Sequence, residues 1–198
     1  MKLILFSMPN SATIDKVEKH LFPESLENKR LAYINPDGSL MPEKVKKYMK
    51  DWEVMCERNN SEFIFIEIDK DLDSERKKIQ SCNLILITGG NGCRLLKNLR
   101  ENNYFNSIKN FIREEGNIFA GFSAGAMVLT PSMKRADYPP FQENEGVGIT
   151  SFDALNVLSF ELFPHYIDEY KQILEEYKRN TSNKVVIMND DEIIIIQT

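Results

Sequence analysis

Short runs of apolar residues alternate along the chain with longer segments in which apolar residues recur every three or four positions. This alternation is typical of strands that are joined by crossover helices in a largely parallel sheet. Most of the apolar runs are continuous, as strands are when helices cover both faces of the sheet. The pattern predicts an α/β fold of three layers, α/β/α, with a mostly parallel central sheet. Its predicted strands span residues 2–6, 31–34, 63–68, 84–87 and 118–121.

The helical pattern is clearest between the second and third predicted strands. Apolar side chains recur there at steps of three and four from Val45 to Met55, with Lys and Glu on the opposite side. Such a stripe is far more typical of a helix packed on a sheet than of a cofactor site. Further helices are predicted around residues 95–99, 104–112 and 167–177.

The end of the chain contains two more apolar runs, at residues 185–188 and 193–196, around Asn189, Asp190 and Asp191. Because Asn and Asp tolerate the backbone geometry of tight turns, this segment predicts a C-terminal β-hairpin.

No linker, repeat or low-complexity tract divides the chain, so residues 1–198 are predicted to form a single domain. Residues 130–150 form the longest stretch without periodicity and contain several prolines and glycines. A loop of this length in a compact domain is often functional.

The charge and the apolar content narrow the class of protein. The 198 residues include 25 Lys and Arg against 30 Asp and Glu, a formal net charge of -5. Charges of both signs are mixed, so partners such as nucleic acid or an anionic membrane are disfavoured. The first apolar run is too short for a signal peptide, and no run reaches the ~18 apolar residues that a membrane span needs. A cytoplasmic protein is therefore expected.

The chain has 3 cysteines, Cys56, Cys82 and Cys93, and 2 histidines. No C-x-x-C pair and no H-E-x-x-H motif occurs. The sequence therefore suggests no disulfide framework, no metal site and no cofactor.

Residues 121–125 match the G-x-S-x-G motif and fall where the predicted strand at 118–121 should meet a helix. A nucleophilic serine, here Ser123, must project from such a sharp turn, and small flanking residues relieve the crowding. The N–H of Ala124 would then point toward an oxyanion. The alternative is a tight connection that merely contains a serine.

A second candidate element, residues 88–92, follows the predicted strand at 84–87 and contains Gly89 and Gly90. Glycines let backbone N–H groups approach a ligand closely, so this turn could stabilise an oxyanion or a phosphate. It lacks both the G-x-G-x-x-G spacing and a Gly-Lys-Ser/Thr sequence, which weakens a nucleotide interpretation.

An activated serine needs a base, and two histidines are available. His165 is placed at a turn after a predicted strand at 154–160, where ligand-handling residues collect, whereas His20 lies on a charged amphipathic segment. His165 is therefore the favoured base. For the residue that orients the imidazole, Asp137 is preferred, and Asp168 and Glu169 remain alternatives.

Four separated motifs resemble, in the expected order, the S51 serine peptidases, the group of aspartyl dipeptidases (dipeptidase E) and cyanophycinases. They are G-G-N at 89–91, G-F-S-A-G-A at 121–126, F-D-A-L-N at 152–156 and F-P-H-Y at 163–166. The resemblance covers roughly residues 84–166. It implies a flavodoxin-like fold similar to that of class I glutamine amidotransferases.

The resemblance also implies roles for individual residues. Ser123 would be the nucleophile and His165 the general base, and the oxyanion hole would consist of Gly89, Gly90 and Ala124. Asp137 falls near an Asn-Asp-Met-Pro sequence of the dipeptidases that holds the third triad residue, although Ala136 replaces the Asn.

Substrate contacts are implied as well. A preference for N-terminal aspartate requires a cation, for which Lys134 and Arg135 are the candidates, and Asn91 of the glycine turn is a further candidate for substrate binding.

These observations predict a serine peptidase, a monomer or a homodimer, that hydrolyses short peptides, N-terminal Asp-X dipeptides among them, through a Ser-His-Asp/Glu acyl-enzyme mechanism. One alternative is an esterase-type acyl hydrolase, and another is a catalytically silent protein that binds a peptide or small ligand. A glutamine amidotransferase is less favoured because Ser123 occupies the position of the cysteine that this chemistry uses. Cys93 is expected to serve packing.

Overall fold

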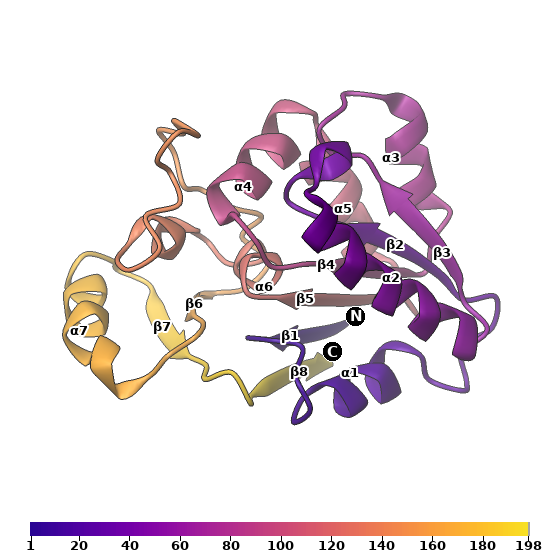
Figure 1. Cartoon of the computed structure of the whole chain (residues 1–198), viewed down its shortest axis with the longest axis horizontal. Helices are drawn as coiled ribbons and strands as arrows, with labels where there is room; N and C mark the ends of the chain where they lie inside the picture. Colours follow the sequence, from indigo (N-terminus) through magenta and orange to yellow (C-terminus); the bar gives the residue numbers. More distant parts are fainter. Residues whose placement is uncertain (198) are drawn as a thin grey trace.

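The computed structural model describes residues 1–197 and contains a central sheet of six strands and a small sheet of two (Figure 1). The strands of the central sheet lie in the order β3-β2-β4-β5-β1-β8. They are β1 (Lys2–Phe6), β2 (Arg30–Ile34), β3 (Glu62–Ile66), β4 (Leu84–Ile87), β5 (Ile118–Phe122) and β8 (Ile193–Gln197). The five strands predicted before the serine motif all form, close to their predicted bounds.

Strands β3, β2, β4, β5 and β1 pair in parallel, and β8 runs antiparallel to β1 at one edge. Side chains of β1 alternate between the two faces, so that Leu3 and Leu5 join one apolar cluster while Ile4 and Phe6 join the other. All four residues of β4 are buried. The continuous apolar runs are therefore explained by helices on both faces of the sheet.

The helices divide between the two faces according to the clusters that they enter. Those of one face are α1 (Ile14–Leu21) and α2 (Glu43–Arg58). Those of the other are α3 (Asp73–Gln80), α4 (Gly92–Glu101), α5 (Tyr104–Arg113) and α6 (Ala124–Met127). This arrangement confirms the predicted three-layer fold. Helix α3 was not predicted because it carries a single large apolar residue, Ile79, among charged and polar ones.

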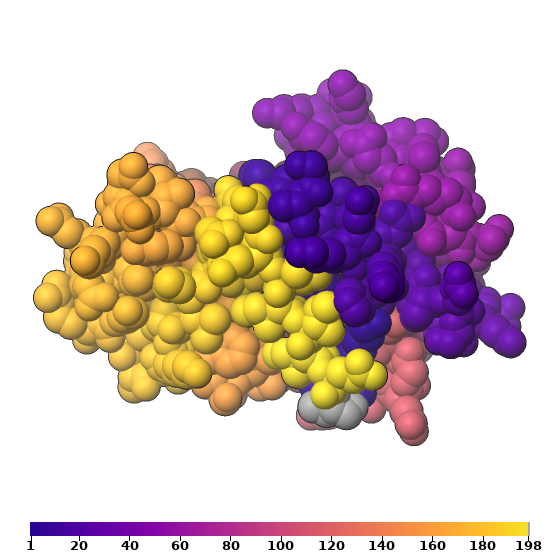
Figure 2. Space-filling view, turned by 90° about the horizontal axis from the view of Figure 1, so that it is seen from below, coloured from indigo at the N-terminus to yellow at the C-terminus, as the bar shows by residue number. Residues whose placement is uncertain are grey.

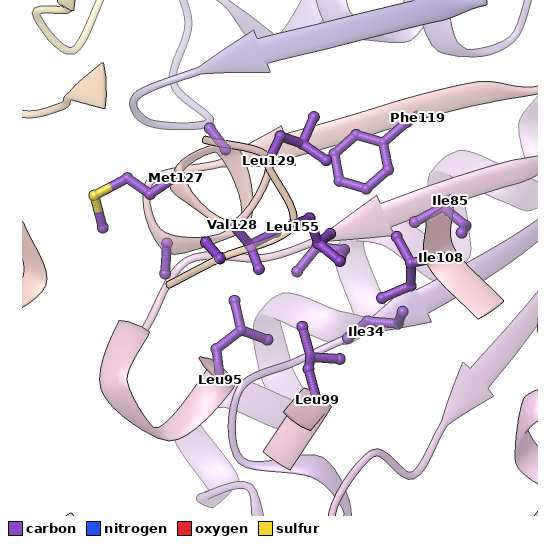
Figure 3. Close-up of a cluster of buried hydrophobic side chains, with 14 of the residues drawn as sticks. Ile34, Ile85, Leu95, Leu99, Ile108, Phe119, Met127, Val128, Leu129 and Leu155 are labelled. Carbon is purple, nitrogen blue, oxygen red and sulfur yellow. The ribbon is translucent and has the colours of Figure 1, made fainter. Parts of the chain in front are cut away.

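The larger apolar cluster lies beneath α6 and the residues that follow it. Figure 3 shows Leu129 beside Phe119 and Val128 beside Leu155, with Leu95 of α4 below Val128. All five side chains are fully buried. The segment after the G-x-S-x-G motif is therefore held by dense packing.

The small sheet consists of β6 (Phe160–Phe163) and β7 (Lys184–Ile187), which pair in parallel. They are connected through the 3-10 turn η3 (Asp168–Tyr170) and α7 (Lys171–Arg179), and the unit lies at the left of Figure 1. Phe163, Leu174 and Tyr177 of this unit form a separate apolar cluster, whereas Leu162 of β6 joins the larger cluster of the central sheet.

Two predictions about this region are wrong. The predicted strand at 154–160 begins only at Phe160, because residues 154–158 bond through their backbone to residues 128–131 instead. The two C-terminal strands form but are not a hairpin, since β7 pairs with β6 and β8 pairs with β1. The segment between them therefore crosses from one sheet to the other.

No helix in the described part of the chain is long and apolar enough to span a bilayer.

Candidate active site

Ser123 lies between β5 and α6, at the sharp turn that the sequence predicts. Its backbone angles are φ 50° and ψ -115°, which is unusual for a residue other than glycine. Such a conformation is strained by about 1–3 kcal/mol and persists only where the surrounding structure enforces it. Here the dense packing around α6 does so, and it projects the hydroxyl from the end of the strand.

The two glycines of the motif are required by close approach. A Cβ atom on Gly125 would lie 1.9 Å from the carbonyl oxygen of Ile87, and one on Gly121 would lie 2.3 Å from the carbonyl oxygen of Gly125. Helix α6 thus packs directly against the backbone of β4 and β5. Only glycine fits at these positions, as the strand-to-helix turn of a nucleophilic serine demands.

His165 lies two residues after the end of β6, and its Nε2 is 2.8 Å from the Oγ of Ser123. Its backbone also has a positive φ, 56°. The ring of Phe141 meets the imidazole edge to face at a centroid distance of 5.9 Å. The other histidine, His20, is in the last turn of α1. The structure therefore brings together Ser123 and His165, from the central and the small sheet respectively.

The carboxylate beside the imidazole is Asp190, whose Oδ1 lies 2.6 Å from the Nδ1 of His165. A carboxylate can only accept, so Nδ1 carries the hydrogen and Nε2 of the neutral ring is left to accept the hydroxyl hydrogen of Ser123. The three groups form an unbroken hydrogen-bond chain in the order of a serine-hydrolase triad.

The structure does not place Asp137 at this position, which corrects the preference for it. Asp137 ends the 3-10 turn η2 (Lys134–Asp137), and its Oδ1 accepts a hydrogen bond from the N–H of Asn144 at 3.2 Å. Asp168 and Glu169 form the start of η3 rather than a contact to the imidazole. The sequence does not single out Asp190, because Asn and Asp at residues 189–191 are equally typical of a tight turn. The available signal is a carboxylate two residues after an apolar run, in the loop that follows a strand.

The glycine turn after β4 lies beside the serine. A Cβ atom on Gly89 would lie 3.1 Å from the Cβ of Ser123, and Gly90 has φ 133°, which favours glycine. Ala124 is the first residue of α6, so its N–H has no acceptor within the helix. Of the predicted oxyanion donors, Gly89 thus lies against Ser123 and Ala124 follows it in the chain, whereas the nearest side chain to Gly90 is that of Pro36.

Asn91 has a structural role that the sequence did not predict. Its Oδ1 accepts a hydrogen bond from Arg94 N at 2.7 Å, which caps α4, and its Nδ2 donates to the carbonyl of Glu143 at 2.9 Å. The N–H of Gly92 donates to the Glu143 carboxylate at 2.5 Å. Asn91 therefore ties the loop at 130–150 to α4, and its side chain is already occupied.

The two candidate cations differ in accessibility. Lys134 is exposed, with its Nζ 5.9 Å from the ring centroid of Tyr138. Arg135 is fully buried between the rings of Phe141 and Phe163, at 4.7 and 3.9 Å. Burial lowers the pKa of its guanidinium to about 10. The side chain of Arg135 thus packs between these two rings and does not extend into solvent, as the side chain of a surface cation would.

Cys93 is fully buried at the start of α4, and burial raises the pKa of its thiol to about 12. A thiol with so high a pKa is un-ionised at neutral pH and is a poor nucleophile. The structure supports a packing role for Cys93.

Comparison with known proteins gives a consistent family. The model of a family described as "Peptidase family S51" matches residues 3–198. "Peptidase E" of Escherichia coli (strain K12 / DH10B) is 30% identical over 88 residues, 44% of this chain and 36% of that protein. "Peptidase E" of Shigella boydii serotype 18 matches to the same extent. The match thus spans about a third of the length of these curated relatives.

Two solved structures share the fold. A structure described as a "Putative Peptidase E Protein" from Listeria monocytogenes EGD-e has a TM-score of 0.78 at 23% identity and covers 98% of this chain and 93% of that one. A peptidase from an acI-B1 Actinobacterium has a TM-score of 0.69 at 16% identity, covering 99% of this chain and 83% of the other. At these identities the likeness concerns the fold.

Proposed function

The chain belongs to peptidase family S51, and from this premise we propose that it is a serine peptidase that hydrolyses short peptides with Ser123, His165 and Asp190 as its catalytic triad. The observation that carries the proposal is the hydrogen-bond chain from Ser123 Oγ through His165 to Asp190, with distances of 2.8 and 2.6 Å. A histidine with a purely structural role would need neither a serine in a strained conformation at Nε2 nor a carboxylate at Nδ1.

In this mechanism the hydroxyl of Ser123 attacks the scissile carbonyl while Nε2 of His165 takes its proton. Asp190 keeps the hydrogen of His165 on Nδ1 and stabilises the imidazolium that forms. The developing oxyanion is stabilised by N–H groups of the Gly89-Gly90 turn and of Ala124, where one such donor is worth about 3 kcal/mol. His165 then protonates the leaving amine, and water releases the acyl group.

The proposed substrates are short peptides, and the Asp-X dipeptides that the resemblance to the aspartyl dipeptidases implies are one class among them. Lys134 is the accessible cation of the loop, whereas Arg135 is buried. We propose that substrate preference depends on the loop at 130–150, whose Phe141 reaches the imidazole.

We further propose that the protein is cytoplasmic, because the three buried cysteines of this chain are free thiols, as is usual in a reducing compartment.

The direct test is labelling by a fluorophosphonate probe followed by mapping of the modified peptide. We expect the label on Ser123 and none in Ser123→Ala. Ser11→Ala, which changes an exposed serine outside the site, should label as the wild type does. Labelling that persists in Ser123→Ala would refute the assignment.

The same protein tested on dipeptides and on p-nitrophenyl esters separates the remaining alternatives. Preferential hydrolysis of dipeptides supports a peptidase, and preferential hydrolysis of esters supports an acyl hydrolase. Binding of intact peptides without hydrolysis would indicate a catalytically silent protein. The altered sequence at Ala136 and Asp137 does not favour this last alternative, because the carboxylate beside His165 is that of Asp190.

A further inference from the structure

Ser7 makes a set of contacts that the proposed mechanism leaves unused. It follows β1 directly and is fully buried. Its Oγ donates to Oδ1 of Asp190 at 2.9 Å and accepts the backbone N–H of His165 at 2.8 Å. The same Oγ lies 3.3 Å from His165 Nδ1. One hydroxyl of the central sheet therefore contacts both residues that the small sheet contributes.

We propose that Ser7 is a positioning residue that holds His165 and Asp190 in line with Ser123. The inference deepens the proposed function and rests on it, because it assigns a task within the same triad. Ser7 cannot act on substrate itself, since it is fully buried behind the imidazole and the carboxylate.

The backbone of His165 shows why such a hydroxyl is needed. A positive φ of 56° is unfavourable for histidine, and the hydrogen bond from His165 N to Ser7 opposes relaxation to an ordinary conformation. A fixed backbone at His165 fixes the point from which the imidazole extends. This matters because Nε2 of the ring must stay within hydrogen-bond reach of Ser123.

The carboxylate of Asp190 is oriented in the same way. Its side chain is 44% exposed, so packing alone does not hold it. The hydrogen bond from Ser7 turns Oδ1 toward the imidazole, and a charge-assisted hydrogen bond of this kind is stronger than a neutral one.

The segment after Ser7 reinforces the arrangement. Asn10 Nδ2 donates to the carbonyl of Asp190 at 2.8 Å and to the Asp191 carboxylate at 2.9 Å. Figure 2 shows the consequence at the surface, where the yellow C-terminal region lies against the indigo N-terminal region. The loop after β1 thus contacts the segment between β7 and β8 at Asp190.

The test is Ser7→Ala, measured by steady-state kinetics on a hydrolysed dipeptide and by proton NMR of the exchangeable proton on His165 Nδ1. We expect kcat to fall about tenfold with KM within about twofold, since the substrate contacts remain while the geometry loosens. We also expect the Nδ1 proton resonance to move or broaden. With only 2 histidines in the chain, its assignment follows from its loss in His165→Gln.

Ser39→Ala is the matched control. It breaks another serine–aspartate hydrogen bond, from Ser39 Oγ to Asp69 Oδ2 at 2.6 Å, beyond β2 and outside the triad network. We expect it to leave kcat and the Nδ1 resonance unchanged. If Ser7→Ala does not fold, Ser7→Cys supplies the same comparison, because a thiol is a weak hydrogen-bond partner of similar shape.

A folded Ser7 variant with wild-type kcat and an unchanged Nδ1 resonance would overturn the proposal, as would a rise in KM without a fall in kcat. A wild-type protein that hydrolyses nothing would instead refute the proposed function, and the NMR comparison would still decide whether Ser7 holds the imidazole.

Discussion

The two sheets contribute to the site in different ways. The central sheet holds Ser123 through packing, with glycines at 121 and 125 and fully buried side chains beyond α6. The small sheet has only two strands, and one of them exposes Ile187, yet it supplies His165 and precedes Asp190. These residues are held by hydrogen bonds to Ser7 and Asn10 in the loop that follows β1. The proposed nucleophile is therefore fixed by packing, and its proposed partners are fixed by polar contacts between loops.

The largest effect is expected where the small sheet meets the nucleophile. His165→Ala should lower kcat/KM on the order of 10⁵-fold, because removal of one triad member disables the whole unit. His20→Ala, at the end of α1, should leave kcat/KM within about twofold of the wild-type value. Dipeptide hydrolysis measures both. Equal losses in the two variants would contradict a specific role for His165.

The packing of the central sheet is tested by Gly125→Ala. The added Cβ would lie 1.9 Å from a carbonyl oxygen of β4, so we expect the free energy of unfolding to fall by about 3 kcal/mol. In Gly116→Ala, nothing lies within 4 Å of the added Cβ, and only the positive φ of 86° opposes it. Its expected loss is about 1 kcal/mol. Denaturant unfolding should separate the two, and a larger loss in Gly116→Ala would contradict close packing at the motif.

The small sheet depends on a buried carboxylate. Glu161 is 2% exposed and accepts hydrogen bonds from Tyr177 and from Thr181 and Asn183, the last two at 2.7 Å. In Glu161→Gln an amide NH₂ group replaces one of the two acceptor oxygens and faces a side chain that also donates. We therefore expect the small sheet to be destabilised by about 2 kcal/mol. Hydrogen exchange should become faster at residues 160–187 and remain slow in β4 and β5. Uniformly faster exchange would show that the two sheets open as one unit.

The smallest effect concerns pH and the loop at 130–150. Burial raises the pKa of Glu143, so the folded state keeps its proton to a higher pH than the unfolded state does. Stability from this group is present below the ordinary value of 4.5 and is lost as pH rises through the folded-state pKa. Glu143→Gln should therefore raise Tm at pH 7 relative to the wild type, and the gain should shrink toward pH 4. A gain that grows in acid would contradict this sign.

Much of the central sheet could be predicted because its strands are buried on both faces and are joined by amphipathic helices, which leaves a clear period in the sequence. Ser123 and His165 could be identified because a motif and a scarcity of histidines singled them out. Asp190 could not, since apolar runs indicate strands without indicating their partners. The burial of Arg135 could not be predicted either, because the ring of Phe163 reaches it from a different part of the chain.

The proposed triad depends on Asp190, which follows the last strand of the small sheet. The most direct measurement compares kcat/KM of Asp190→Asn and Asp137→Asn on one dipeptide. We expect a loss on the order of 10⁴-fold for Asp190→Asn, because an amide can hold His165 in the wrong tautomer. Asp137→Asn should stay within about threefold of the wild type, since an amide oxygen can still accept the Asn144 N–H. A large loss in Asp137→Asn together with an active Asp190→Asn would contradict the account.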